Sequence, residues 1–170
     1  MRGLSDEAIW KKLDEILSSS TCLKTQTAAA IIKDNEVLSV GCNFCAPEGY
    51  DYREKFSCCP RMAIKTGKNY ELCKPIHAEV VAALGIRKDR NYSELGKYAS
   101  HLSLSESDIR AAFSEEELNK LSGATLYLIG HYRACEGCVK FLDTVGIKTI
   151  KLNEKSSETI KSRYTDLKIT

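Results

Sequence analysis

The chain has 170 residues, of which 25 are basic and 23 acidic, so its net charge is +2. This length predicts a single domain, residues 1–170, that can bury a hydrophobic core. Its content of 43% hydrophobic and 28% charged residues is typical of a soluble globular protein. The near balance of charge argues against a polynucleotide-binding face, which usually appears as a strongly basic domain.

No apolar stretch approaches the ~20 residues that a membrane-spanning helix needs. The charged N-terminus "MRGLSDEAIWKKLDEIL" lacks the apolar centre of a secretory signal. We therefore expect no membrane partner and a cytoplasmic location, where the eight cysteines would remain free of disulfides. Metal binding and burial as small apolar residues are both expected, each for different cysteines.

The first half of the chain predicts a helix followed by a β-hairpin. Apolar residues at helical spacing predict a helix over residues 5–18. Two short apolar runs on either side of Asp34 and Asn35 predict a hairpin over residues 28–40. Residues 43–75 have no regular period, and a loop of that length in a compact domain is usually functional or disordered. Its cysteines and aromatic residues favour a functional segment.

The middle of the chain predicts one buried helix and a polar insertion. Apolar residues between 76 and 86 suit a largely buried helix. Residues 87–122 are polar and predict surface helices, with capped starts at Ser107 and Ser114.

The last third predicts a strand, a helix and a second strand. The apolar run "ATLYLIG" predicts a buried strand over residues 124–130, and apolar residues between 138 and 145 suit a helix. The alternating "IKTIKL" predicts a strand over residues 147–152. A strand, helix and strand in this order imply parallel strands and a layered α/β fold.

Cys135 and Cys138 form a Cys-x-x-Cys pair in "ACEGC", which can be a redox pair or half of a zinc site. The redox interpretation needs a thioredoxin-like context near the N-terminus, whereas this pair lies late in the chain. His77 would add a third ligand, and three protein ligands with one open position characterise catalytic zinc, because structural sites usually close with four. Two helix N-termini could bring the three residues together and would also stabilise thiolates.

Glu79 follows His77 by two residues, so its carboxylate could reach the open zinc position without being a ligand. Zinc lowers the pKa of bound water toward ~7, and a carboxylate beside that water can carry its proton to a leaving nitrogen. A zinc-stabilised protein without catalysis is the alternative, but a purely structural site would not need Glu79.

The "HAE" tripeptide followed by "CEGC" matches the H-x-E and C-x-x-C signature of zinc deaminases of nucleobases. From about Thr25 to Leu152 the chain resembles the cytidine and deoxycytidylate deaminase family. The stretch "CPRMAIKTGKNYELCKPIHAE" is similar to the deoxycytidylate branch. The resemblance implies a three-layer α/β/α fold with a mixed sheet of about five strands, the first hairpin antiparallel and the later strands parallel.

The resemblance also implies that His77, Cys135 and Cys138 bind the catalytic zinc and that Glu79 moves protons. Water would attack the C4 carbon of a cytosine nucleotide and ammonia would leave, so dCMP would become dUMP. The partner would thus be a small-molecule nucleotide. Deamination of guanine, cytidine or a riboflavin-pathway pyrimidine is the alternative.

Four residues are candidates for substrate binding, three of them by the same resemblance and Arg61 from the cluster of basic residues in the loop at 43–75. Asn43 would contact the sugar, and Ala78 would present its backbone to the pyrimidine. Arg61 could hold a 5′-phosphate through two parallel hydrogen bonds, although a solvated basic loop is the alternative. Arg133 occupies a position that commonly faces the ring, and Ala134 stands where the family usually has proline.

A second, structural zinc is predicted at four further cysteines, since four thiolates would order a segment with little core of its own. The alternative is that they are free buried thiols. The resemblance also implies a homo-oligomer, either a dimer or a hexamer, and the insertion at 87–122 would cover the pocket, form an interface or decorate the surface. The four candidate ligands are Cys45, Cys58, Cys59 and Cys73.

Overall fold

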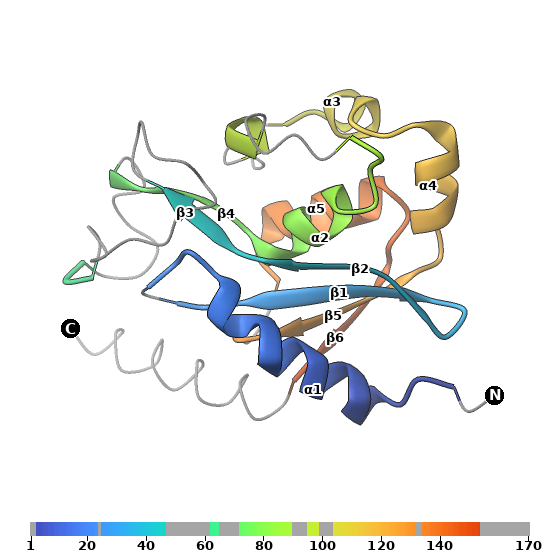
Figure 1. Cartoon of the computed structure of the whole chain (residues 1–170). Helices are drawn as coiled ribbons and strands as arrows, with labels where there is room; N and C mark the ends of the chain where they lie inside the picture. Colours follow the sequence, from blue (N-terminus) through green and yellow to red (C-terminus); the bar gives the residue numbers. More distant parts are fainter. Residues whose placement is uncertain are drawn as a thin grey trace.

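A computed structural model of the chain describes residues 3–23, 25–46, 62–64, 72–89, 95–98, 104–131 and 134–153. Its centre is a four-stranded sheet in the order β2-β1-β5-β6, next to a separate two-stranded sheet of β3 and β4 (Figure 1). The strands are β1 (Ala28–Lys33), β2 (Glu36–Cys42), β3 (Phe44–Ala46), β4 (Lys74–Ile76), β5 (Thr125–Ile129) and β6 (Thr149–Leu152). The α-helices are α1 (Asp6–Ile16), α2 (Ala78–Leu84), α3 (Glu106–Ala111), α4 (Glu115–Leu121) and α5 (Glu136–Thr144), and a short 3₁₀ helix, Leu17–Ser19, follows α1.

The main sheet is mixed, as the sequence predicts. Strand β1 is antiparallel to both β2 and β5, whereas β5 and β6 are parallel. The predicted antiparallel hairpin and the parallel later strands are therefore confirmed. The described residues place four strands in this sheet instead of about five, because β3 leaves the sheet after β2 and pairs with β4.

The hairpin between β1 and β2 turns at the two residues that the sequence indicated. Asp34 and Asn35 both have positive φ angles, 51° and 62°. Two consecutive residues in this conformation form the turn whose twist matches that of the flanking strands, and Asn and Asp tolerate it better than most residues.

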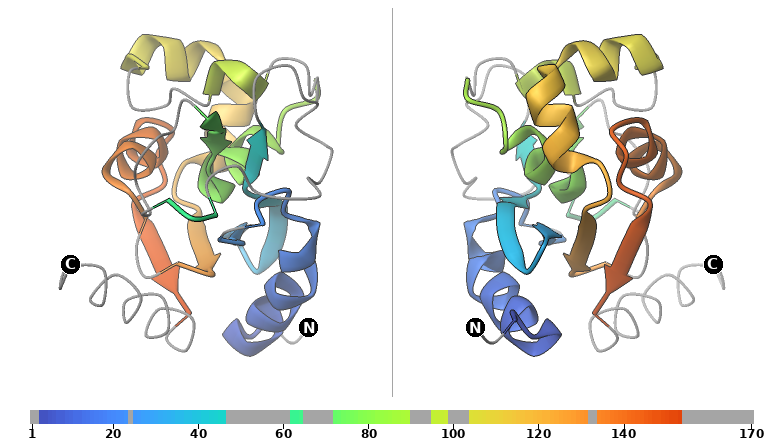
Figure 2. Two further views of the ribbon diagram at one scale, coloured as in Figure 1. Left: turned by 90° about the vertical axis from the view of Figure 1, so that its left-hand side faces the viewer. Right: turned by 90° about the vertical axis from the view of Figure 1, so that its right-hand side faces the viewer.

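Helices cover both faces of the sheet, so the fold has three layers. Figure 1 shows α1 below the sheet and α2 with α5 above it, and Figure 2 shows the same layers from the side. The side chains of β1 alternate between the two faces. Ala29 and Ile31 belong to the core under α2 and α5, whereas Ala28, Ala30 and Ile32 belong to the core under α1.

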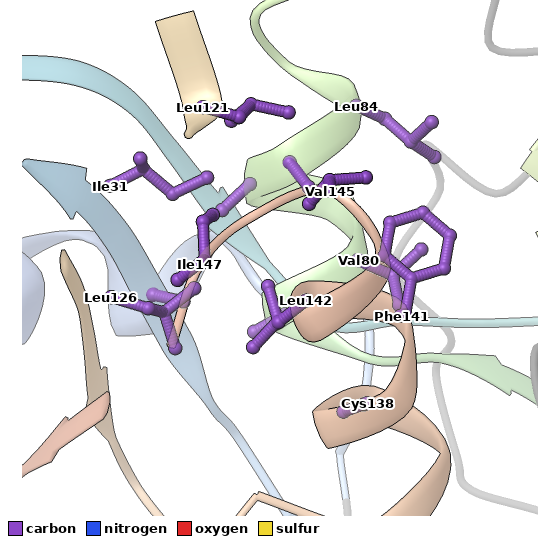
Figure 3. Packing of buried hydrophobic residues seen from close by; sticks show 14 of the residues in the cluster. Ile31, Val80, Leu84, Leu121, Leu126, Cys138, Phe141, Leu142, Val145 and Ile147 are labelled. Atoms are coloured by element: carbon purple, nitrogen blue, oxygen red, sulfur yellow. The ribbon is translucent and has the colours of Figure 1, made fainter. Parts of the chain in front are cut away.

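The larger core lies between the sheet and the helices α2 and α5 (Figure 3). Val80 of α2, Phe141 of α5 and Leu126 of β5 are each fully buried in it. Cys138 is also fully buried in this cluster, so one candidate zinc ligand stands on the main hydrophobic core of the protein.

The α1 face is fixed by aromatic packing and a polar link. The rings of Trp10 and Tyr127 are T-shaped with centroids 5.1 Å apart, and the Tyr127 hydroxyl donates a hydrogen bond to Asp6 at 2.6 Å. Lys151 of β6 also reaches Asp6, at 3.2 Å. Trp10 and Tyr127 thus pack α1 against the sheet.

Two sequence-based boundaries are wrong. The buried helix begins at Ala78, not at residue 76, because Pro75 and Ile76 pair with β3 as part of β4. In the insertion, Ser114 caps α4 as predicted, but α3 is capped by Ser105 and not by Ser107. The reason is that a capping box needs an acceptor three residues on; Asp108 supplies it for Ser105, whereas Ser107 would have an arginine there.

The described part of the insertion contributes to the core, since Ile109, Phe113 and Leu121 pack into the cluster under α2 and α5. The side chain of Glu117 links α4 to the segment that follows α2, because the Glu117 carboxylate accepts a hydrogen bond from the backbone N–H of Lys88 at 3.1 Å. In the described part of the chain, no helix has the length and apolar character to cross a membrane.

Candidate zinc centre

His77, Cys135 and Cys138 meet at the N-terminal ends of α2 and α5. His77 is the N-cap of α2, Cys135 is the N-cap of α5, and Cys138 lies in the first turn of α5. Their donor atoms all lie within 4.8 Å of one another, and His77 Nδ1 is 3.3 Å from the sulfur of each cysteine. The structure therefore brings together the three residues that the sequence selected.

This geometry fits zinc. Zn–N bonds of about 2.0 to 2.1 Å and Zn–S bonds of about 2.3 Å in a tetrahedral arrangement place nitrogen and sulfur roughly 3.6 Å apart. A ring nitrogen such as Nδ1 has a single hydrogen-bonding site, so it cannot serve two thiols well at once. Convergence of one nitrogen and two sulfurs is explained better by a shared cation than by hydrogen bonds alone.

Local backbone structure orients these ligands. The backbone N–H of Cys138 donates to the sulfur of Cys135 at 3.4 Å, which is the usual N-cap bond made by a thiol in place of a hydroxyl. His77 makes no side-chain capping bond to α2, so its ring is directed to the cysteines. The three-residue spacing within one helical turn then places Cys138 beside Cys135.

Close packing against the sheet holds α2 in this place. A Cβ atom on Gly41 of β2 would lie only 2.5 Å from the backbone nitrogen of Ala82. Only glycine permits such an approach, so Gly41 sets how near α2 lies to β2.

Glu79 lies in the first turn of α2 with only 4% of its surface exposed. The negative charge of Glu79 contributes to the pKa shifts of two of the candidate ligands, Cys138 and His77. The hydrogen bond with Cys135, burial and the negative charge of Glu79 raise the pKa of Cys138 far above its ordinary value. Burial lowers the pKa of His77, but the hydrogen bond with Cys135 and the charge of Glu79 outweigh it, so the net pKa is raised. A divalent cation would relieve this accumulation of negative charge.

Asn43 lies at the same end of the molecule. Phe44 and Ile76 form the last pair of the β3–β4 ladder, and Asn43 and His77 are their chain neighbours beyond that pair. Ala78 is fully buried next to His77. Arg61 and Arg133, the other two candidate substrate contacts, lie outside the described residues.

Sequence reasoning missed the residues that hold Asn43. Its side chain is bonded to Ser20, Thr25 and Thr27, and Ser20 is fully buried. These residues lie 16 to 23 positions from Asn43 and follow no motif spacing. Only Ser20 bonds Asn43 through its side chain, whereas Thr25 and Thr27 do so through backbone atoms that every residue type has, so the sequence carried no signal for these contacts.

A second cysteine cluster contains none of the three residues His77, Cys135 and Cys138. Cys45 and Cys73, two of the four predicted ligands, are buried together with Cys22, which the sequence did not select. Hydrogen bonds with Cys22 and Cys73, together with burial, raise the pKa of Cys45 far above its ordinary value. The remaining predicted ligands, Cys58 and Cys59, lie outside the described residues.

The sequence pattern of the "Cytidine and deoxycytidylate deaminase zinc-binding region" matches residues 5–154. The dCMP deaminase of the cyanophage S-TIM5, solved in complex with dCMP and dUMP, is similar with 18% identity and a TM-score of 0.51 over 94% of each chain. The apo form of the S-TIM5 enzyme is similar with 19% identity and a TM-score of 0.47, over 92% of this chain and 89% of that one. No curated protein matches the sequence significantly.

The match to the family covers most of the chain, including the H-x-E and C-x-x-C segments, and the S-TIM5 complex shares its α/β fold. The converging histidine and cysteines supply a set of ligands suited to the zinc ion of that family. The protein is therefore a member of the cytidine and deoxycytidylate deaminase family and a zinc-dependent hydrolytic deaminase.

Proposed function

We propose that this protein converts dCMP and water to dUMP and ammonia. The observation that carries the proposal is the position of His77 Nδ1, 3.3 Å from the sulfurs of both Cys135 and Cys138, with the buried carboxylate of Glu79 beside them. The choice of nucleotide is supported by the S-TIM5 enzyme, which has the same fold and was solved with dCMP and dUMP.

In the proposed mechanism His77, Cys135 and Cys138 hold the zinc ion through one nitrogen and two sulfurs. A bound zinc ion would acidify a water molecule and so supply the nucleophile for hydrolysis. Glu79 would take one proton from the attacking water and give it to the ring nitrogen N3. It would then take the remaining proton, from the hydroxyl group left on C4, and give it to the departing amine, which leaves as ammonia. The burial of Glu79 excludes bulk water, so its protons pass to the substrate instead of to solvent.

The role of Glu79 is tested by Glu79→Gln. The amide keeps the shape of the side chain but cannot accept and return a proton, so we expect kcat for dCMP to fall by ~10²–10⁴-fold. Zinc content should stay at the wild-type level, because Glu79 is not a ligand. Deamination is followed by ammonia release, and zinc by elemental analysis of the purified protein.

Glu117→Gln is the matched control. Glu117 is also a buried glutamate in the first turn of a short helix, with 7% exposure, but it caps α4 through Ser114. Glutamine preserves a capping box, so this variant should keep wild-type deamination. A fully active Glu79→Gln enzyme would refute the proposed mechanism.

The substrate is tested with a panel of dCMP, CMP, dCTP, cytidine and guanine. We expect dCMP to give the highest kcat/KM. Asn43 would contact the sugar, Ala78 would present its backbone to the pyrimidine, and Arg61 and Arg133 would contact the phosphate and the ring. Turnover of another member of the panel, with dCMP unchanged, would show that the substrate assignment is wrong.

We further propose a second, structural zinc that includes Cys45 and Cys73, with Cys22 as an additional thiolate. Burial of the three sulfurs in one cluster supports it. Among the described residues only the His77 group has all its donor atoms within 4.8 Å, so this second site needs a direct metal count. Two zinc ions per wild-type chain and one per Cys45→Ser chain are expected. One zinc in both proteins would refute the second site.

The family resemblance supports a homo-oligomer, a dimer or a hexamer, as a final proposal. Strand β2 is at an edge of the main sheet, and its Val40 is 37% exposed. Light scattering of the purified protein gives the mass directly, and a monomeric mass over the working concentration range would contradict this proposal.

A further inference from the structure

We propose that Ser20 is a positioning residue whose hydroxyl fixes the side-chain amide of Asn43, so that the amide presents an N–H group and not its carbonyl oxygen to the substrate sugar. The inference rests on the proposed function, in which Asn43 meets the sugar of a cytosine nucleotide. It adds the chemical direction of that contact, which the backbone of Thr25 and Thr27 determines, and the buried side chain that holds the amide in this place.

The orientation of the amide follows from its partners. Asn43 Oδ1 accepts a hydrogen bond from the backbone N–H of Thr27 at 3.0 Å, and Asn43 Nδ2 donates to the backbone carbonyl of Thr25 at 2.8 Å. A backbone N–H can only donate and a backbone carbonyl can only accept. Reversing the amide would therefore turn both bonds into repulsive contacts.

Ser20 completes this arrangement. Its hydroxyl donates to Asn43 Oδ1 and lies 3.0 Å from the backbone oxygen of the same residue. The Ser20 oxygen in turn accepts the backbone N–H of Cys22 at 3.1 Å. Since the bonds from Thr25 and Thr27 come from backbone atoms, Ser20 is the one side chain among them that a substitution can remove.

The side-chain amide of Asn43 then has one hydrogen-bonding position left for a ligand. A carbonyl oxygen of this type has two lone pairs, and Ser20 and Thr27 use both. The Nδ2 group has two hydrogens, and Thr25 uses one; within the described part of the chain the other has no partner. A ligand that reaches Asn43 therefore meets a donor, so its contacting atom must be an acceptor such as a sugar oxygen.

The position of Asn43 makes this contact relevant to the zinc centre. Asn43 and His77 adjoin the last pair of the β3–β4 ladder, Phe44 and Ile76, and the backbone N–H of Asn43 donates a hydrogen bond to the carbonyl of Thr27 at 3.1 Å. Both the backbone and the side chain of Asn43 are thus held to the segment before β1. Ser20 is completely buried, so water cannot replace its hydroxyl.

The experiment is a double-mutant cycle with Ser20→Ala and Asn43→Ala, using dCMP and its 2′,3′-dideoxy analogue, which lacks the 3′-hydroxyl. With dCMP we expect each single variant to lower kcat/KM by roughly tenfold, mainly through KM, because a ground-state binding contact is lost. The double variant should be no worse than Asn43→Ala alone, since Ser20 acts only through Asn43. With the dideoxy analogue, the effect of Ser20→Ala should disappear.

Thr21→Val is the matched control. Thr21 is the next residue, is 2% exposed, and its hydroxyl bonds to the backbone of Cys45 and not to Asn43. It should lower the thermal midpoint as Ser20→Ala does, while kcat/KM for dCMP stays near the wild-type value. Equal losses of kcat/KM in Thr21→Val and Ser20→Ala would overturn the proposal, and so would losses that multiply in the double variant.

Two further outcomes are distinguishable. A wild-type enzyme that leaves dCMP unchanged contradicts the proposed function, and the cycle is then measured on the nucleotide that it does deaminate. Should Ser20→Ala fail to fold, ¹⁵N NMR of the wild-type Asn43 side chain replaces it. One slowly exchanging proton and one proton that shifts on addition of dUMP support the proposal, whereas an amide that does not respond to dUMP overturns it.

Discussion

The described residues of the protein include two clusters of potential metal ligands that differ in how they are supported. His77, Cys135 and Cys138 stand at the starts of two helices that pack in the main core, and all their donor atoms lie within 4.8 Å. The second cluster consists of three buried cysteines: Cys22 in the loop before β1, Cys45 in β3 and Cys73 just before β4. The Cys45 thiol is hydrogen-bonded to both Cys22 and Cys73.

The difference shows what a converging metal site requires. A helix start fixes both the position and the direction of its first side chains, because the first turn has few backbone alternatives. The second cluster instead depends on side-chain hydrogen bonds, such as those between Thr21 and the backbone of Cys45. Burial alone therefore brings sulfur atoms close together, whereas the start of a rigid helix also fixes the direction in which each ligand points.

The largest expected effect separates the two clusters by activity. Cys138→Ser should lose the catalytic zinc and lower the rate of dCMP deamination on the order of a thousandfold or more, because the metal supplies the nucleophile. Cys45→Ser should keep that zinc and lower the thermal midpoint instead. Zinc content and ammonia release measured on both variants check this. Equal loss of activity in the two variants would show that the two clusters do not differ in their role.

The next effect tests the helical support of the zinc cluster. Phe141 is fully buried in α5, one turn beyond Cys138, and faces Phe113 at 6.3 Å between ring centroids. Phe141→Ala should lower the free energy of unfolding by about 3–5 kcal/mol. Urea unfolding of the zinc-free protein measures this without the contribution of metal binding.

Val139→Ala is the control for Phe141, because Val139 lies on the same helix with 45% of its surface exposed. It should change the free energy of unfolding by less than about 0.5 kcal/mol. Equal losses of unfolding free energy in the two variants would mean that burial of Phe141 in the core does not stabilise α5.

A smaller effect tests the hydrogen-bonded support of the second cluster. The Thr21 hydroxyl accepts the backbone N–H of Cys45 at 2.8 Å and donates to its carbonyl at 3.2 Å. Thr21→Val leaves both buried backbone groups without this partner, so the free energy of unfolding should fall by about 1–3 kcal/mol. Thr149→Val, at an exposed position of β6, should have almost no effect in the same urea titration.

The smallest effect concerns Cys42, a buried thiol outside both clusters. Its sulfur donates to the backbone carbonyl of Ile16, and burial raises its pKa from 9.0 to about 11. The folded protein therefore retains a proton that the unfolded chain loses, so stability falls as the pH rises from 9 to 11. The thermal midpoint of Cys42→Ala should fall less steeply than that of the wild type over this range. If the thermal midpoints of the two proteins fall equally steeply with pH, the raised pKa of Cys42 is contradicted.

Much of the fold was predictable because local patterns and burial agree. The alternation of Ala28 to Ile32 between two cores follows from the period of a strand, and the turn at Asp34 and Asn35 follows from residues that tolerate positive φ. The helix boundary at Ala78 was not predictable, because Pro75 and Ile76 pair with a distant strand that leaves no trace in their own sequence.

The sequence by itself determined the chemistry of the zinc centre, since only His77, Glu79 and the Cys-x-x-Cys pair combine ligand types with a proton carrier at short, fixed spacings. Tertiary structure alone decided which distant residues contact Asn43 and Cys45, two residues that the sequence had selected. Ser20 reaches Asn43 from 23 positions away, and Cys22 joins Cys45 and Cys73. Contacts between distant segments depend on how loops and strands pack, and no local pattern encodes that packing.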